Sequence, residues 1–155
     1  MGKEAVAREV VAQLQEELAN IASMYPVSRP VRVFFEEWPD PLISGIGWVS
    51  DLIEYLGGED IFRDLYGRRV APERIITRDE VARRAPEVII ASWCGKKAKL
   101  EEIRTRPEWQ DVPAVRRGHI YEIPSDIILQ TGPGILEGAR VLAQILHKVA
   151  AESDT

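Results

Sequence analysis

The chain has one cysteine, two histidines and no apolar run long enough to cross a bilayer. A single cysteine excludes an intramolecular disulfide and leaves the redox compartment undetermined. His119 and His147 have no partner at the spacing of a metal site, so we expect both to be structural or surface residues. The first residues run directly into a charged amphipathic pattern, with no apolar signal core, so the chain as written is expected in the cytoplasm.

Neither basic nor acidic residues are in large excess. The 20 basic and 25 acidic residues give a formal net charge of -5, which provides no general field for attracting nucleic acid. The arginine pairs at 68–69, 83–84 and 116–117 are short and scattered, so they do not form a phosphate track. We therefore expect no nucleic-acid partner. A length of 155 residues with 45% hydrophobic residues fits one ordinary globular domain.

Hydrophobic periodicity predicts alternating helices and strands. Helices are expected at about 4–23, 47–56, 97–104 and 133–150, with a short helix capped by Thr77 and Glu80. Apolar runs predict buried strands at 31–35, 86–91 and 119–123. Alternation of this kind favours an α/β fold, a three-layer sandwich with a mostly parallel sheet, preceded by the long amphipathic helix.

Three predicted loops follow the carboxyl ends of the three strands, at 38–47, 92–97 and 125–132. In a parallel sheet these loops meet at one edge, where α/β proteins bind ligands. The first loop carries Trp38, Asp40 and Trp48. The tryptophans can stack on a planar or macrocyclic ligand, or they can be core residues that close the loop onto the sheet. Asp40, between two prolines, is a turn residue or a ligand contact.

The second loop contains Trp93, Cys94, Gly95 and two lysines. It looks like the start of a thioredoxin motif, but Lys97 stands where the second cysteine would be, so dithiol exchange within the motif is excluded. A thiol after a strand, at a helix N-terminus and beside lysines should ionise readily, which keeps a monothiol oxidoreductase open. The alternative is a small residue packed under the loop or lining a pocket.

The third loop offers Asp126, which can accept hydrogen bonds from ligand amides or hydroxyls, or can form an Asx turn or a cap. The segment 131–134 presents a helix N-terminus that can bind an anion, although it lacks the length and the lysine of a phosphate loop. We expect it only to start the last helix.

Several runs form one combined pattern: Glu-Trp-Pro-Asp-Pro at 37–41 with Gly45 and Trp48, Leu-Ile-Glu at 52–54, Gly-Gly-Glu-Asp-Ile-Phe at 57–62, Pro-Glu-Val-Ile-Ile at 86–90, 114–121, and Gly132-Pro133. This pattern covers essentially the whole chain. It resembles the cobalamin and iron-siderophore substrate-binding proteins of ABC importers, and is most similar to their cobalamin-binding group. Such proteins have two α/β lobes joined by a long helix, with the ligand clamped between the lobes.

The resemblance implies that residues 1–25 are the joining helix and residues 28–152 the C-terminal lobe, without the first lobe and its anchor. It implies a non-enzymatic lobe that needs no cofactor and takes cobalamin, a corrinoid, as its candidate ligand. The implied partners are an ABC permease and either a separate N-terminal lobe or a second copy of the chain. It further implies an extracytoplasmic location.

The resemblance also implies cleft-facing positions for six residues: Trp38, Asp40, Trp48, Trp93, Cys94 and Asp126. Ile127 stands where related cobalamin binders place an aromatic residue. Glu36, Glu37 and Asp51 are candidates for docking onto transporter arginines. Three alternatives stay open: a ferric-siderophore or haem lobe, a monothiol oxidoreductase using Cys94, and an interaction module that has lost its ligand.

Overall fold

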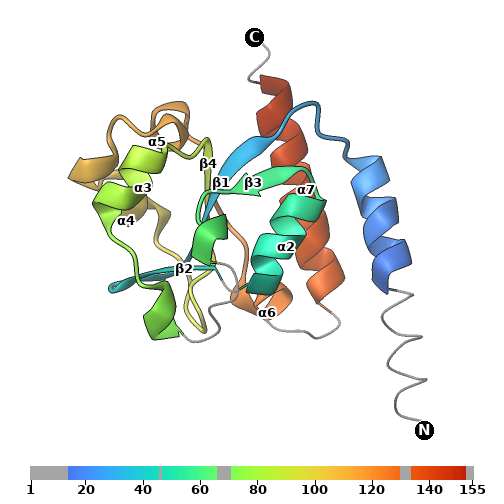
Figure 1. Cartoon of the computed structure of the whole chain (residues 1–155), viewed down its shortest axis with the longest axis horizontal. Helices are drawn as coiled ribbons and strands as arrows, with labels where there is room; N and C mark the ends of the chain where they lie inside the picture. Colours follow the sequence, from blue (N-terminus) through green and yellow to red (C-terminus); the bar gives the residue numbers. More distant parts are fainter. Residues whose placement is uncertain (1–13, 46, 66–70, 130–133, 153–155) are drawn as a thin grey trace, which may run out of the picture.

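The computed structural model describes residues 14–45, 47–65, 71–129 and 134–152. Its centre is a five-stranded sheet around β1 (Val31–Pro39), shown in Figure 1. On one side, β1 pairs in parallel with β4 (Val88–Ala91), which pairs in parallel with β5 (Ile120–Glu122). On the other side, the start of β1 pairs in parallel with β3 (Gly58–Asp60), and its end pairs antiparallel with β2 (Leu42–Ser44). The predicted mostly parallel sheet is confirmed.

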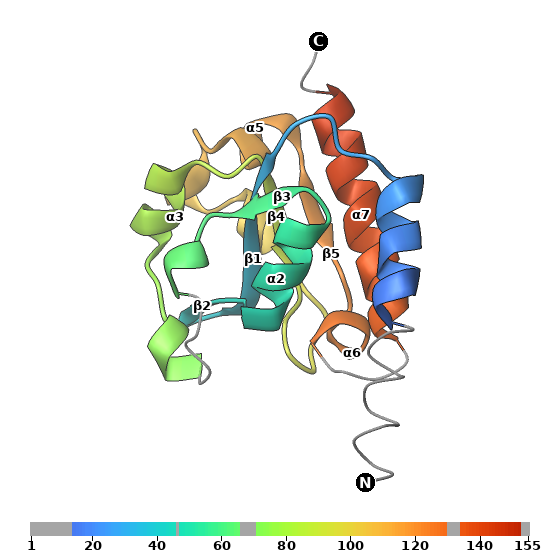
Figure 2. The same cartoon turned by 45° about the vertical axis from the view of Figure 1, so that its right-hand side comes forward.

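Helices cover both faces of the sheet, as Figure 2 shows. One layer consists of α2 (Gly47–Tyr55), α6 (Ser125–Ile128) and α7 (Ile135–Glu152). The other consists of α3 (Arg78–Arg84), α4 (Leu100–Arg104) and α5 (Pro113–Arg117), with short 3-10 turns at Arg63–Leu65, Ala71–Arg74 and Pro107–Trp109. The chain is therefore the predicted three-layer α/β sandwich. In the described part of the chain, no helix is both long enough and apolar enough to span a bilayer.

The central strands supply the core on both faces. Along β1, Val33 and Phe35 pack with α2 and α7, whereas Phe34 packs with the α3, α4 and α5 layer. In β4, Ile90 and Ile89 divide in the same way. Successive side chains of a strand point to opposite faces, so a strand covered on both sides must be apolar throughout. This explains why the runs at 31–35 and 86–91 predicted buried strands correctly.

The first helix is described over residues 14–24 and lies against the α7 side of the lobe (Figure 1). Ile21 is buried in the same core cluster as α7. The residues that follow this helix are bonded to α7. Gln144 Nε2 donates to the Tyr25 hydroxyl at 2.9 Å, and His147 Nδ1 donates to the Pro26 carbonyl oxygen at 2.5 Å. The predicted helix between 4 and 13 lies outside the described residues.

The predicted loop at 38–47 is wrong. The structure continues β1 through Trp38 to Pro39 and returns it as β2, so a hairpin replaces most of the loop. The prolines suggested a break, but this part of β1 pairs with a short edge strand through Trp38 and Ile43, where proline is tolerated.

The sequence also left three short elements unpredicted: β3, α5 and α6. Each has three to five residues, too few to show a period. After α2 ends, Gly57 has φ +104°, a conformation that only glycine adopts easily.

The predicted cap of α3 is confirmed, because Thr77 Oγ1 accepts a hydrogen bond from the Glu80 backbone N–H at 3.1 Å. Replacing the cap in Thr77→Ala is expected to lower the free energy of unfolding by about 1 kcal/mol, since the N–H loses its partner. Urea unfolding measures the change. Thr77→Ser keeps the hydroxyl and serves as the control, and equal losses in the two variants would contradict the capping role.

Candidate functional site

The three predicted loop regions come together at the carboxyl edge of the sheet, although the first of them is the β1–β2 hairpin and not a loop. The Cys94 backbone N–H donates to the Glu37 carbonyl oxygen at 3.2 Å, which joins the second loop to β1. The Gly95 N–H donates to Ser125 Oγ at 3.1 Å, which joins the second loop to the start of α6. This edge of the lobe is therefore one continuous surface built from three distant parts of the chain.

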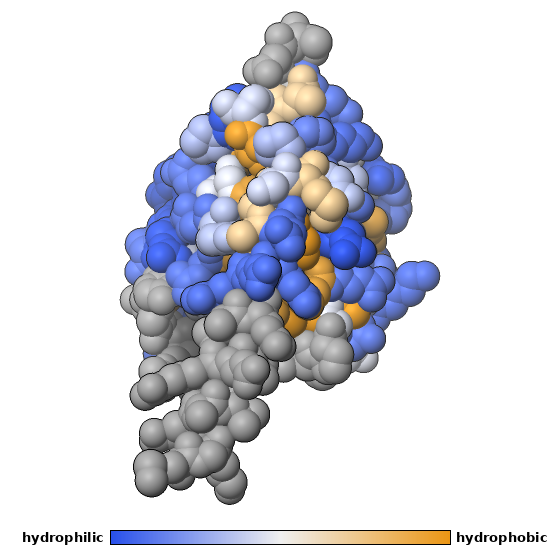
Figure 3. Space-filling model, turned by 90° about the vertical axis from the view of Figure 1, so that its right-hand side faces the viewer, coloured by the Kyte–Doolittle hydropathy of each residue, from blue (hydrophilic) through white to orange (hydrophobic). Residues whose placement is uncertain are grey.

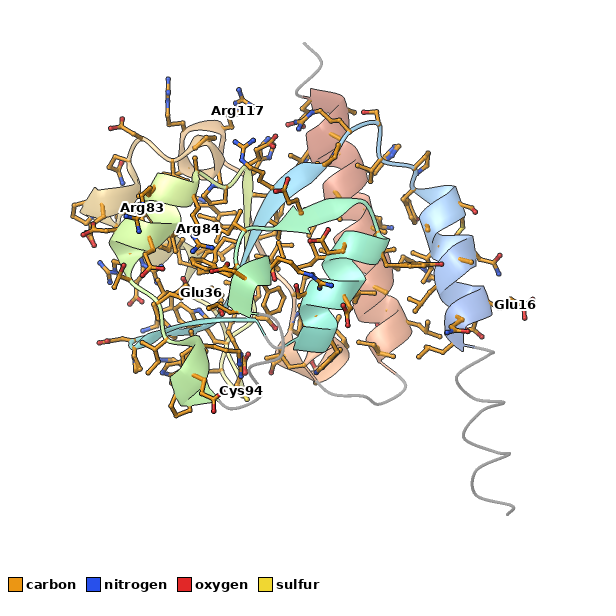
Figure 4. The ribbon with its side chains drawn as sticks, viewed as in Figure 1. Glu16, Glu36, Arg83, Arg84, Cys94 and Arg117 are labelled. Carbon is orange, nitrogen blue, oxygen red and sulfur yellow. The ribbon has the colours of Figure 1, made fainter. Side chains whose placement is uncertain are left out.

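A buried charge network lies beneath this edge and centres on Glu36, whose side chain is fully buried (Figure 4). Arg106 donates to both carboxylate oxygens, from Nη1 at 2.6 Å and from Nη2 at 3.1 Å. Trp93 Nε1 donates to Glu36 Oε2 at 2.8 Å. The Arg106 guanidinium also lies 4.4 Å from the centroid of the Trp109 ring. The predicted docking role of Glu36 on a transporter is thus wrong, because its carboxylate is enclosed and fully engaged.

A second buried arginine ties the hairpin together. Arg74 Nη1 donates to Glu37 Oε2 at 2.5 Å and to the Ser44 carbonyl oxygen at 2.6 Å, joining β1 to β2. The sequence analysis missed Arg74 and Arg106. The available signal was the acid pair Glu36-Glu37 directly after the predicted buried strand at 31–35, because carboxylates that become buried need cationic partners.

Trp38 is half-buried at the end of β1, and its indole N–H donates to the Asp40 carbonyl oxygen at 3.2 Å. The Lys96 ammonium lies 6.0 Å from the centroid of the Trp38 ring and 5.6 Å from that of Trp93. Trp93 itself is only 1% exposed, so in this structure it supports the loop from below. The edge thus presents one accessible indole with a cation beside it.

Cys94 is exposed, in the turn that follows Trp93 (Figure 4). Helix α4 begins only at Leu100, so the expected position of the thiol at a helix N-terminus is wrong.

The other predicted site residues lie around this edge. Trp48, on α2, packs partly against the core and lines an apolar groove of about 490 Å³ that also involves the first helix: Leu14, Gln15, Leu18, Asp51, Leu52, Tyr55 and Ile135. Figure 3 shows apolar side chains among charged ones on the face that carries the first helix. Asp40 is exposed and lines a second, polar hollow of about 410 Å³ with Arg78 and Arg106.

Asp126 is exposed in the first turn of α6. The six predicted residues are therefore spread over the edge and two neighbouring hollows, and their contact with a ligand stays a prediction. Asp51 forms an exposed ion pair with Arg63 at 3.0 Å. Among the described residues, no group of three or more histidine, cysteine or acidic side chains is arranged to hold a metal ion.

Comparison with known proteins connects this lobe to a family. The model of the family described as periplasmic binding protein matches residues 1–127. The chain belongs to this family. A vitamin B12-binding protein of Vibrio parahaemolyticus is 26% identical over 132 residues, which cover 83% of this chain and 45% of that protein. The periplasmic binding protein chain thus spans about half the length of the curated relatives it matches.

Solved structures show the same fold. A periplasmic binding protein from Veillonella parvula superposes with a TM-score of 0.73 at 22% identity, covering 96% of this chain and 52% of that one. The periplasmic haem-binding protein of Roseiflexus gives a TM-score of 0.74 at 19% identity, covering 92% and 56%. The predicted relationship to ABC substrate-binding proteins is confirmed. The matched family is one of binding proteins, and the oxidoreductase alternative has no support from it.

Proposed function

We propose that this chain is the joining helix, residues 1–25, and the C-terminal lobe, residues 28–152, of a corrinoid-binding protein that serves an ABC importer. The observation that carries the proposal is the edge where the end of β1, which carries Trp38, is joined to the second loop and through it to the start of α6. The relative named as a vitamin B12-binding protein supports the choice of ligand. Trp38, Asp40, Trp48, Cys94 and Asp126 are the proposed contacts, with Trp93 supporting them from below.

In this proposal the edge forms one side of a ligand-binding cleft, and tight binding requires a second surface that faces it. A flat macrocycle that stacks on Trp38 would leave its other face in water, so a lobe acting alone gains only part of the apolar burial that drives binding. We therefore propose that the chain works with a separate N-terminal lobe or with a second copy of itself. The proposed site of action is outside the cytoplasm, as the family implies, with a permease as the recipient of the ligand.

Titration with cyanocobalamin tests the proposal. We expect Trp38→Ala to weaken binding by about tenfold, or about 1.4 kcal/mol, because the ligand loses the indole face. Isothermal calorimetry and the corrinoid absorption spectrum give the affinity, and sedimentation gives the assembly state in the same samples.

Met24→Ala is the matched control, since Met24 is a 55% exposed apolar side chain at the end of the first helix and lines neither of the two hollows. Its affinity should equal that of the unmodified chain. A strictly monomeric chain without a calorimetric or spectral response to cyanocobalamin would remove the proposal.

The second candidate is a haem or ferric-siderophore lobe, and the observation that favours it is the cation at the edge. Lys96 is exposed on the second loop beside Trp38, and an anionic chelate suits a cation in this position. Parallel titrations with hemin and a ferric siderophore separate this candidate from the first, since each ligand has its own absorption change. A response to one of these and none to cyanocobalamin would favour it.

A further inference from the structure

The Lys96 side chain extends beside Trp38 at this edge. Its backbone is held in place, because the Lys96 N–H donates to the Trp93 carbonyl oxygen at 3.1 Å and the adjacent Gly95 is bonded to Ser125. Trp93, below it, is fixed through its bond to the buried Glu36. The ammonium therefore extends from a supported loop.

The surroundings of this ammonium are aromatic. Within the described residues it contacts the rings of Trp38 and Trp93, at 6.0 and 5.6 Å from their centroids, and no carboxylate forms an ion pair with it. Its loop neighbour Lys99, in contrast, lies 3.8 Å from Glu102. An exposed cation held over indole faces retains most of its charge for another partner, because a ring neutralises it far less than a carboxylate does.

We propose that Lys96 selects for charge: it pairs with an anionic group, a carboxylate or a phosphodiester, on the flat ligand that stacks against Trp38. This inference rests on the proposed binding function. A macrocycle lying on Trp38 excludes water from the space beside the ring, and an ion pair formed there is stronger than one in open solvent. Lys96 thereby fixes which side of the ligand faces the second loop.

The position of the charge can be tested without any ligand. Iodide quenching of tryptophan fluorescence should be greater than caesium quenching, because the ammonium concentrates anions near Trp38. Lys96→Gln should lower the iodide quenching constant by about a third and raise the caesium constant, whereas Lys97→Gln, one residue away, should change both much less. Trp38→Phe identifies the share of the signal that comes from Trp38. Equal effects of the two lysine variants would overturn the assignment.

The selection itself is tested with three probes: cyanocobalamin, which carries a phosphodiester, hemin, which carries two carboxylates, and hemin dimethyl ester, which carries none. Lys96→Gln should weaken binding of the anionic probe that the chain recognises by about three- to tenfold and should flatten its salt dependence. Binding of the dimethyl ester should not change.

The outcomes separate the two proposals. If Lys96→Gln weakens the binding of cyanocobalamin, the group that pairs with Lys96 is a phosphodiester. If it weakens the binding of hemin but not of hemin dimethyl ester, the group is a carboxylate. If the unmodified chain binds a probe and Lys96→Gln matches Lys97→Gln, or if hemin and its ester lose equally, only the role of Lys96 is overturned. If the unmodified chain binds none of the probes, the binding function and the role of Lys96 are both overturned.

Discussion

Arg106→Ala is expected to lower the free energy of unfolding by about 3–5 kcal/mol. Arg106 is 4% exposed and donates two hydrogen bonds to Glu36, which has no exposed surface. Without the guanidinium, a carboxylate is left in the core with only the indole N–H of Trp93 as a donor. Urea unfolding followed by tryptophan fluorescence measures the loss, and it reports directly on Trp93 and Trp109, the two rings beside the pair.

Two further variants serve as comparisons for Arg106→Ala. Arg104→Ala, two residues away at the end of α4, removes an exposed ion pair with Glu101 and should lower the free energy of unfolding by only about 0–1 kcal/mol. The double variant Glu36→Gln with Arg106→Met removes both charges and keeps an oxygen acceptor for Trp93, so it should recover a large part of the stability. Equal losses in Arg106→Ala and in the double variant would show that lost packing, and not an unpaired charge, is responsible.

Gly138→Ala is expected to destabilise the lobe by about 1–3 kcal/mol. Gly138 lies in α7, and a Cβ there would be 2.0 Å from the backbone oxygen of Ile127 and 2.9 Å from its carbonyl carbon. Relief requires α6 and α7 to separate, because the obstacle is backbone and not the end of a flexible side chain. The same movement would displace Ser125 from Gly95 and open the three-loop edge.

The sign of the stability change in Gly138→Ala distinguishes close packing from helix propensity. In an exposed helix, replacing glycine by alanine stabilises by about 1 kcal/mol, so helix propensity alone predicts the opposite result. Thermal unfolding of Gly138→Ala measures the change. Glu137→Ala, at the exposed neighbouring position, provides the baseline for altering this turn of the helix. A gain in stability for Gly138→Ala would contradict the close packing of α6 on α7.

The sequence predicted those parts of the fold that repeat a pattern. The apolar residues of β1 and β4 and the stripe of α7 are long enough to show a strand or helix period, and each was found within a few residues. The three-residue strand β3 and the four-residue helix α6 are too short to show a period. Contacts with β1 and α7, which lie far away in the sequence or outside these elements, hold them in place. The hairpin of β1 and β2 was hidden by two prolines that an edge strand accepts.

The sequence likewise predicted some features of the candidate site and missed others. The sequence predicted that three loops meet at one edge, because the direction of parallel strands fixes where the strands end. It could not predict that Glu36 pairs with Arg106, since 70 residues separate them and neither position shows a local pattern. The burial of Trp93 follows from that pair, and the position of Lys96 follows from Trp93. Long-range electrostatics therefore decided the details that local pattern could not.

The short outer strands have a consequence for the behaviour of the protein in solution. The free sides of the sheet are formed by β2, β3 and β5, each three residues long, and the long strand β1 is covered by β3 along its start and by β2 along its end. Strands this short give another chain very few backbone groups to pair with, which protects a sheet from edge-to-edge aggregation. Among the described residues the sheet therefore leaves few backbone groups open to pairing between molecules, which disfavours polymerisation through its edges.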